Sequence, residues 1–164
     1  MKILDDRQVR QKIRRLAIEI LEKNYEEPEI ILAGINNNGM TFARLLSDQL
    51  KAITSQVITL TRLSINPANP VATEVYLEIP VEQTRGKVVI IADDVANTGR
   101  TIFYACKPFM ATLPKKIEVA VIVDRTHKSF PVKVDYVGLS LATTLLEDID
   151  VRIREVEEFS VYLN

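Results

Sequence analysis

Two adjacent acidic residues, Asp93 and Asp94, end the apolar run KVVIIADD. Two neighbouring carboxylates repel one another, so such a pair is costly unless hydroxyl donors or a cation share it. The vicinal hydroxyls of a ribose, together with Mg²⁺, would serve both carboxylates. The alternative interpretation is an ordinary turn between a strand and a helix, capped by acidic residues.

A turn of small and polar residues follows the acidic pair and leads into a predicted helix. Its residues are Ala96, Asn97, Thr98, Gly99, Arg100 and Thr101. The first N–H groups of a helix have no partner inside it, so they and the threonine hydroxyls can face one anion. The turn therefore indicates a phosphate cradle. Because it lies so close to the acids, the two features together favour a ribose 5-phosphate as ligand. Neither GxxxxGK[ST] nor GxGxxG occurs in the chain, which excludes two other phosphate-binding loops.

Alternating strands and helices must position these residues. Helical spacing predicts an amphipathic first helix through Val9, Ile13, Leu16, Ala17 and Ile20, a second helix over 39–51, and a third that starts near Thr101 and is cut short by Pro108. Apolar runs predict strands at 29–35, 56–62, 74–80, 87–94, 117–124 and 135–140, and two further strands in the tail 151–164 that turn at Glu157 and Glu158. Loops are expected at 36–39 and 63–73. This order predicts a three-layer α/β fold with a mainly parallel sheet, whose ligands bind at the carboxyl ends of the strands.

Length and composition limit the number of domains and the classes of protein to which the chain could belong. The 164 residues predict one domain, 1–164, and a hydrophobic fraction of 47% with a net charge of −1 excludes intrinsic disorder as the main state. With 21 basic and 22 acidic residues, no overall field attracts nucleic acid. The single cysteine, Cys106, is expected to be a buried apolar residue. The first residues carry acids and no unbroken apolar run, so we expect a cytoplasmic protein with no membrane span.

The segment VVIIADDVANTGRTI resembles the phosphoribosyl pyrophosphate (PRPP) signature of type I phosphoribosyltransferases. The segments RRLAIEILEKN and VIVDRTHKSFPVKVDYVG and the two-strand tail are similar to the family of the pyrimidine operon regulator and uracil phosphoribosyltransferase, over nearly the whole chain. This resemblance implies a Rossmann-like core with a small hood and a C-terminal hairpin. It also implies PRPP and Mg²⁺ as ligands, uracil as the base, and a homo-oligomer, either a dimer or a tetramer.

The resemblance implies roles for individual residues. Asp93 and Asp94 hold the ribose diol and the metal shell, with Asp94 also catalytic, and residues 96–101 wrap the 5-phosphate. Pyrophosphate binds at the loop from Ile35 through Asn36, Asn37 and Asn38 to Gly39, and Arg62 supplies a catalytic cation from a flexible loop. Arg125 lies on the substrate side, and Val137 and Gly138 lie in the hood beside the base. His127 is either a surface turn residue or a group on the substrate or RNA side.

Several positions depart from the family pattern. Where the pyrophosphate loop of the family reads Thr-Arg-Gly, this chain has Asn37, Asn38 and Gly39, so one cation is missing. After Arg62, Leu63 and Ser64 replace two acids.

Other departures concern RNA and the base. Ile18 and Leu139 replace a histidine and a lysine that serve RNA in the regulator, so RNA is an unlikely partner. Asn97 replaces an aspartate that handles a base proton in purine enzymes, which favours a pyrimidine. The leading hypothesis is a phosphoribosyltransferase that uses uracil. The alternatives are a PRPP-binding or nucleotide-binding regulator of pyrimidine metabolism with weak or no catalysis, and a phosphoribosyltransferase for another base.

Overall fold

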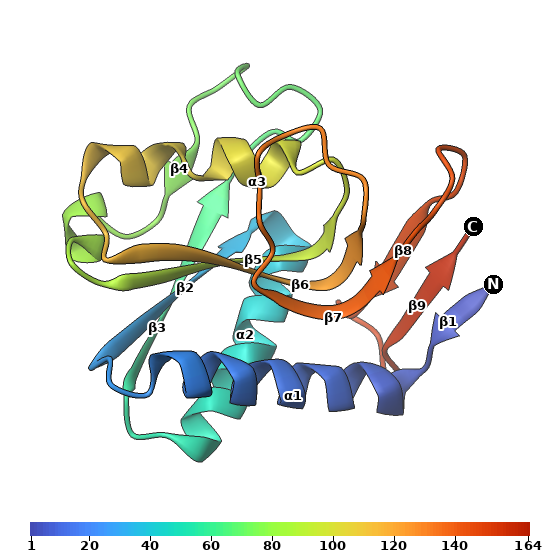
Figure 1. The fold of residues 1–164 in the computed structure, drawn as a ribbon, viewed down its shortest axis with the longest axis horizontal. Helices are drawn as coiled ribbons and strands as arrows, with labels where there is room; N and C mark the ends of the chain where they lie inside the picture. The colour runs from blue at the N-terminus through green and yellow to red at the C-terminus, as the bar shows by residue number, and fades with distance from the viewer.

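A six-stranded sheet runs through the middle of the molecule in the order β4-β3-β2-β5-β6-β7 (Figure 1). The structure is a computed structural model that describes residues 1–164. All neighbouring strands are parallel except β4, which runs antiparallel to β3. The strands are β2 (Glu29–Ile35), β3 (Val57–Ser64), β4 (Tyr76–Leu77), β5 (Val88–Ala96), β6 (Lys116–Arg125) and β7 (Tyr136–Leu141). The predicted mainly parallel sheet is therefore confirmed.

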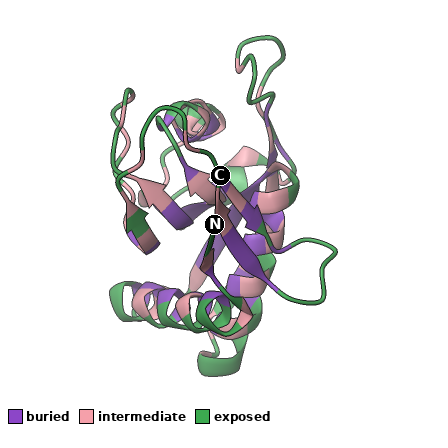
Figure 2. Ribbon diagram, turned by 90° about the vertical axis from the view of Figure 1, so that its right-hand side faces the viewer, coloured by how far each residue is buried: buried purple, intermediate pink, exposed green.

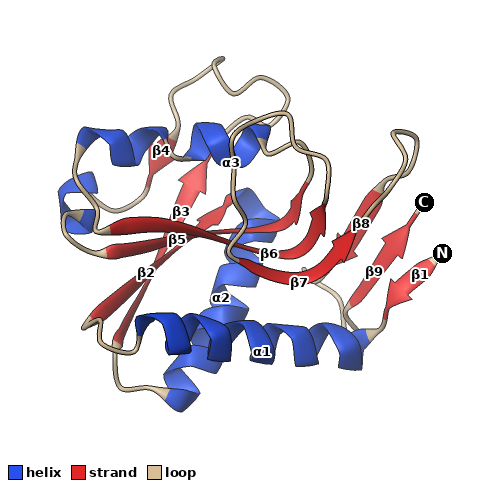
Figure 3. Cartoon of the chain, viewed as in Figure 1, coloured by secondary structure: helices blue, strands red, loops and turns tan.

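Helices cover both faces of this sheet (Figure 3). On one face lie α1 (Asp6–Asn24) and α2 (Asn36–Ile53), and on the other lie α3 (Arg100–Ala105) and the 3₁₀ helix η2 (Lys107–Ala111), with η1 (Val81–Thr84) close by. The side chains of β5 alternate between the two faces, so Val88 and Ile90 join one apolar cluster while Val89 and Ile91 join the other. A strand buried on both faces needs such a continuous apolar run. The three-layer prediction is confirmed.

The first helix forms for the reasons its sequence indicates. Asp5 caps it by accepting a hydrogen bond from the Gln8 N–H, while the Gln8 side chain accepts one from the Asp5 N–H. Its predicted apolar residues are all buried against the sheet, whereas exposed residues occupy the outer side of the helix (Figure 2). None of the helices in the chain has the length and apolar composition needed to cross a membrane.

A second, three-stranded sheet in the order β1-β9-β8 joins the two ends of the chain. Its strands are β1 (Lys2–Leu4), β8 (Ile149–Arg152) and β9 (Ser160–Leu163). The two predicted tail strands are present, and they gain β1 as a third partner that the sequence did not indicate. Apolar residues of this small sheet, such as Leu4 and Val151, join the cluster beneath α1.

Two predicted elements differ in the structure. The segment 74–80 contains only a two-residue strand, because β4 pairs with β3 through Leu77 and Tyr76 alone. The expected loop at 36–39 is the first turn of α2, which follows β2 with no connection between them. The close crossing requires glycine, since a Cβ on Gly34 would lie 2.5 Å from the Cα of Met40.

Candidate functional site

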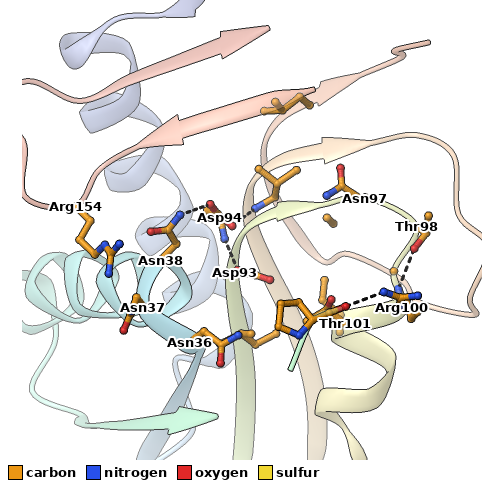
Figure 4. Close-up of a pocket in the computed structure, with 17 residues that line it drawn as sticks. Asn36, Asn37, Asn38, Asp93, Asp94, Asn97, Thr98, Arg100, Thr101 and Arg154 are labelled. Atoms are coloured by element: carbon orange, nitrogen blue, oxygen red, sulfur yellow. Dashed lines mark hydrogen bonds between the residues drawn. The ribbon is translucent and has the colours of Figure 1, made fainter. Parts of the chain in front are cut away.

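A cavity of about 740 Å³ opens at the carboxyl end of β5 (Figure 4). Its walls come from the last residues of β5, the turn into α3, the first residues of α2, and the small sheet. Seventeen residues line it: Ile35, Asn36, Asn37, Asn38, Pro67, Asp93, Asp94, Val95, Ala96, Asn97, Thr98, Gly99, Arg100, Thr101, Ile102, Ile149 and Arg154. The acidic pair and the proposed phosphate cradle therefore face the same space.

The two acids are held by hydrogen bonds from neutral groups. The Asp94 N–H donates to Asp93 Oδ1 at 2.9 Å, and the Val95 N–H donates to Asp94 Oδ1 at 2.8 Å. Asn38 Nδ2 donates to Asp94 Oδ2 at 2.8 Å. Neither carboxylate forms an ion pair within the chain. Burial raises the pKa of Asp93 well above its ordinary value, and the charge of Asp94 raises it further.

This donor set fits a magnesium ion that shares its shell with a ligand. No group of three or more His, Cys, Asp or Glu side chains in the chain could hold a metal by itself. Magnesium is usually bound by one or two carboxylates, completed by water and substrate phosphates. Asp93 and Asp94 are adjacent carboxylates that no Lys or Arg side chain neutralises. They are therefore suited to bind a Mg²⁺ ion that is also coordinated by a phosphorylated ligand.

The turn after β5 forms a rigid cradle of backbone donors. The Thr98 carbonyl accepts hydrogen bonds from the N–H groups of Ser129 and Phe130 at 3.0 and 3.2 Å. Gly99 adopts φ +86°, a left-handed conformation that side chains rarely allow. The N–H groups of Thr98, Gly99 and Thr101 donate to no acceptor within the chain. Three free donors thus converge at one end of the cavity.

We expect Thr101→Ala to weaken binding of a ribose 5-phosphate ligand by about 1 kcal/mol, roughly fivefold, because it removes one neutral hydrogen-bonding group and leaves the backbone donors in place. Calorimetric titration with ribose 5-phosphate measures this change. An unchanged affinity would show that the Thr101 hydroxyl does not contact the phosphate.

The start of α2 supplies the opposite end of the cavity. The Asn36 side chain pairs with the backbone of Ile65 in both directions, at 2.9 and 3.0 Å, and Asn36 itself has φ 52°. Asn37 Oδ1 accepts a hydrogen bond from Arg62 Nη1 at 3.0 Å. Gly39 is buried below the lining, where a Cβ would lie 2.6 Å from the Ala92 carbonyl oxygen. Of the three asparagines, Asn37 and Asn38 reach the acids and cations of the site.

Five predicted site residues lie outside the cavity lining: Gly39, which is buried below it, and Arg62, Arg125, Val137 and Gly138. Arg62 lies in the strand β3 rather than in a flexible loop, and it reaches the site through Asn37. Arg125 ends β6 and donates to Asn97 Oδ1 at 3.2 Å, so it orients a lining residue. Val137 and Gly138 lie in β7 of the central sheet. Their carbonyl oxygens accept hydrogen bonds from Arg15 and Lys12 of α1, because that helix packs across β7.

Five lining residues were not among the predicted site residues. Val95 and Ile102 adjoin predicted residues in β5 and α3, whereas Pro67, Ile149 and Arg154 come from other segments. Pro67 belongs to the expected loop and accepts a hydrogen bond from Arg100 Nη2 at 2.7 Å through its carbonyl. Ile149 and Arg154 come from the small sheet, and no spacing in the tail connects them to β5. His127 is exposed and does not line the cavity.

Comparison with known proteins agrees with this geometry. The family of phosphoribosyl transferase domains matches residues 1–157. The chain is 34% identical over 169 residues to the bifunctional protein PyrR of Clostridium acetobutylicum, covering 96% of this chain and 92% of that protein. It is 36% identical over 167 residues to the bifunctional protein PyrR of Elusimicrobium minutum, covering 94% and 90%.

Solved structures agree on the fold. The hypoxanthine phosphoribosyltransferase of Trypanosoma cruzi superimposes with a TM-score of 0.77 at 16% identity, covering 98% of this chain and 95% of that one. A hypoxanthine-guanine phosphoribosyltransferase of Bacillus anthracis gives 0.70 at 21% identity, covering 86% and 82%. The fold and the resemblance expected from the sequence are both confirmed. The chain therefore belongs to the phosphoribosyl transferase family, with bifunctional PyrR proteins among its relatives.

Proposed function

We propose that this chain transfers the ribose 5-phosphate group of PRPP to uracil and releases pyrophosphate. The observation that carries the proposal is the single cavity in which Asp93 and Asp94 lie between a backbone phosphate cradle and the start of α2. PRPP has the matching order of groups, with a 5-phosphate, a ribose diol and a pyrophosphate.

Different residues along the cavity bind different groups of the substrates. The N–H groups of Thr98, Gly99 and Thr101 bind the 5-phosphate, and the acidic pair orients the diol. The buried side chain of Ile149 offers an apolar surface to the flat base, while Asn97 offers an amide at the edge of the same space. The contact of Val137 and Gly138 with the base stays a prediction.

The reaction is a displacement at the anomeric carbon of the ribose. The bond from this carbon to the pyrophosphate oxygen breaks, a bond to the uracil nitrogen forms, and the departing pyrophosphate takes up the proton of that nitrogen. Positive charge develops on the ribose in an oxocarbenium-like state, which the neighbouring carboxylates stabilise electrostatically. Mg²⁺, which Asp93 and Asp94 would hold, neutralises charge on the departing pyrophosphate when bound.

A panel of bases tests the substrate. The protein is incubated with PRPP, Mg²⁺ and either uracil, cytosine, hypoxanthine, guanine or adenine, and pyrophosphate release is measured. We expect release with uracil at a rate well above that with any other base. The resemblance to the family of the pyrimidine operon regulator and uracil phosphoribosyltransferase supports uracil, as does Asn97, since an amide cannot take up a base proton. Release with another base alone would overturn uracil, and PRPP binding without release would favour the regulator.

RNA binding is expected to be weak and non-specific. Within α1, Arg10 pairs with Asp6 and Arg15 pairs with Glu19, so part of the basic face is already neutralised. We expect a Kd of roughly 10⁻⁴ to 10⁻⁶ M or weaker for a structured leader RNA, rising steeply with salt. A filter-binding assay with and without uridine nucleotide measures it. Tight, nucleotide-dependent binding at physiological salt would make the regulator the leading function.

A further inference from the structure

One cation on the cavity wall has no partner within the chain. Arg154 follows β8 and lines the cavity, yet its guanidinium forms no hydrogen bond and no ion pair. The other arginines around the site are engaged: Arg100 donates to the Pro67 carbonyl, Arg62 to Asn37, and Arg125 to Asn97. Arg154 therefore keeps its hydrogen-bonding capacity for a group inside the cavity.

The fold directs Arg154 into the cavity. The preceding residue, Ile153, is buried in the core and is 3% exposed. The following residue, Glu155, has φ 54°, a left-handed conformation that is uncommon outside glycine and costs free energy. The nearby Arg152 points elsewhere, since it pairs with Asp150 at 2.7 Å and stacks on the Tyr162 ring at 4.4 Å. Two arginines of one short segment thus have different surroundings.

Arg154 lies at the end of the cavity where the other lining residues, Asn36, Asn37 and Asn38, carry no positive charge. Figure 4 shows its side chain beside Asn37 and Asn38, on the far side of the acidic pair from Thr98 and Arg100. Neither asparagine carries charge, and Asn38 is already engaged, since its Nδ2 donates to Asp94 Oδ2. A polyanion at this end would need a cation from another element.

We infer that Arg154 binds the pyrophosphate group of PRPP and supplies from the small sheet the positive charge that Asn38 cannot supply from α2. The inference rests on the proposed function for the order of groups along the cavity. A guanidinium can donate two parallel hydrogen bonds to phosphate oxygens. Arg154 would therefore both neutralise charge on the pyrophosphate and fix its orientation. The small sheet then takes part in substrate binding as well as covering the base.

Two ligands that differ only at the pyrophosphate test the inference. Calorimetry in Mg²⁺ compares PRPP with ribose 5-phosphate for the parent protein, Arg154→Gln and Arg152→Gln. We expect Arg154→Gln to weaken PRPP binding by about tenfold or more, the size of a lost charge-assisted hydrogen bond, and to leave ribose 5-phosphate binding unchanged. Arg152→Gln, the matched control, should bind both ligands like the parent. Pyrophosphate should also compete less effectively for the Arg154→Gln protein.

Several outcomes would overturn the inference. One is a PRPP affinity of Arg154→Gln equal to that of Arg152→Gln, and another is a parallel loss of ribose 5-phosphate affinity, which would indicate a change in the cradle. A parent protein that binds PRPP no better than ribose 5-phosphate would also refute it. These binding measurements need no base and no turnover. If no base gives pyrophosphate release, the proposed transferase activity is refuted, but the role of Arg154 in PRPP binding can still be tested.

Discussion

Replacing both Asp93 and Asp94 with asparagine is expected to abolish PRPP binding while the chain remains folded. Asparagine keeps the size of each side chain and can still hydrogen-bond to its neighbours, but it removes both charges. The diol loses two anionic acceptors and Mg²⁺ loses its protein ligands. Calorimetry with PRPP and Mg²⁺ measures the loss, and Asp48→Asn, on α2 outside this cavity, serves as the control. Unchanged PRPP affinity in the folded double variant would refute the site.

Replacing Asp93 alone with asparagine is expected to stabilise the protein in the presence of a chelator. The folded state raises the pKa of Asp93, because burial and the charge of Asp94 disfavour its ionised form. The parent protein therefore loses stability as pH rises from the unfolded pKa of about 3.9 through the raised folded value. Thermal melts at neutral pH should show a higher Tm for Asp93→Asn than for the parent, with the difference vanishing near pH 3. Equal Tm values at neutral pH would contradict this sign.

Gly99→Val is expected to weaken ribose 5-phosphate binding by about 3 kcal/mol, roughly 150-fold, since several phosphate contacts depend on one backbone conformation. Gly99 has φ +86°, and a Cβ there would lie 3.3 Å from the Cβ of Val132 and 3.4 Å from the Cδ of Lys128. A side chain at this glycine could be expected to block the approach of the phosphate to the backbone. In the structure the side chain instead meets Val132, so the loss comes through distortion of the cradle.

The comparison with Thr101→Ala tests this explanation. Gly99→Val should lower the Tm as well as the affinity. Gly99→Ala has the same positive φ but less strain, because alanine is not β-branched, so it provides a folded intermediate case. Affinity should fall in the order parent, Thr101→Ala, Gly99→Ala, Gly99→Val. A larger loss for Thr101→Ala than for Gly99→Val would show that the hydroxyl, rather than the backbone, binds the phosphate.

The local sequence was sufficient to predict the strand that carries the two acids and the turn that forms the phosphate cradle. The apolar run before Asp93 can be buried only between two layers, and the small residues after it permit a tight turn into a helix. Both features are encoded within fifteen residues, so pattern and structure agree there. The first helix was predictable for the same reason, since its apolar spacing and its acidic cap are local.

Non-local contacts explain what the sequence did not indicate. The three asparagines read as a loop, but the reciprocal pairing of Asn36 with Ile65 places them at the start of a helix. β1 has only three residues and is a strand because it meets β9 at the other end of the chain. Ile149 and Arg154 reach the cavity through the same small sheet. Their positions in the cavity depend on tertiary packing, which the residue pattern of the tail does not predict.

The pairing of β1 with β9 has a consequence for local unfolding. The N–H of Leu163 donates to the Met1 carbonyl at 2.8 Å, so the small sheet closes a loop of the entire chain, whereas the cradle rests on consecutive strands of the central sheet. The strands of the small sheet have at most four residues, and such short segments open at lower free energy than a buried parallel core. Amide hydrogens of β8 and β9 should therefore exchange before those of β5. At moderate urea concentrations, the wall that holds Arg154 would detach as a unit while the phosphate cradle stays native.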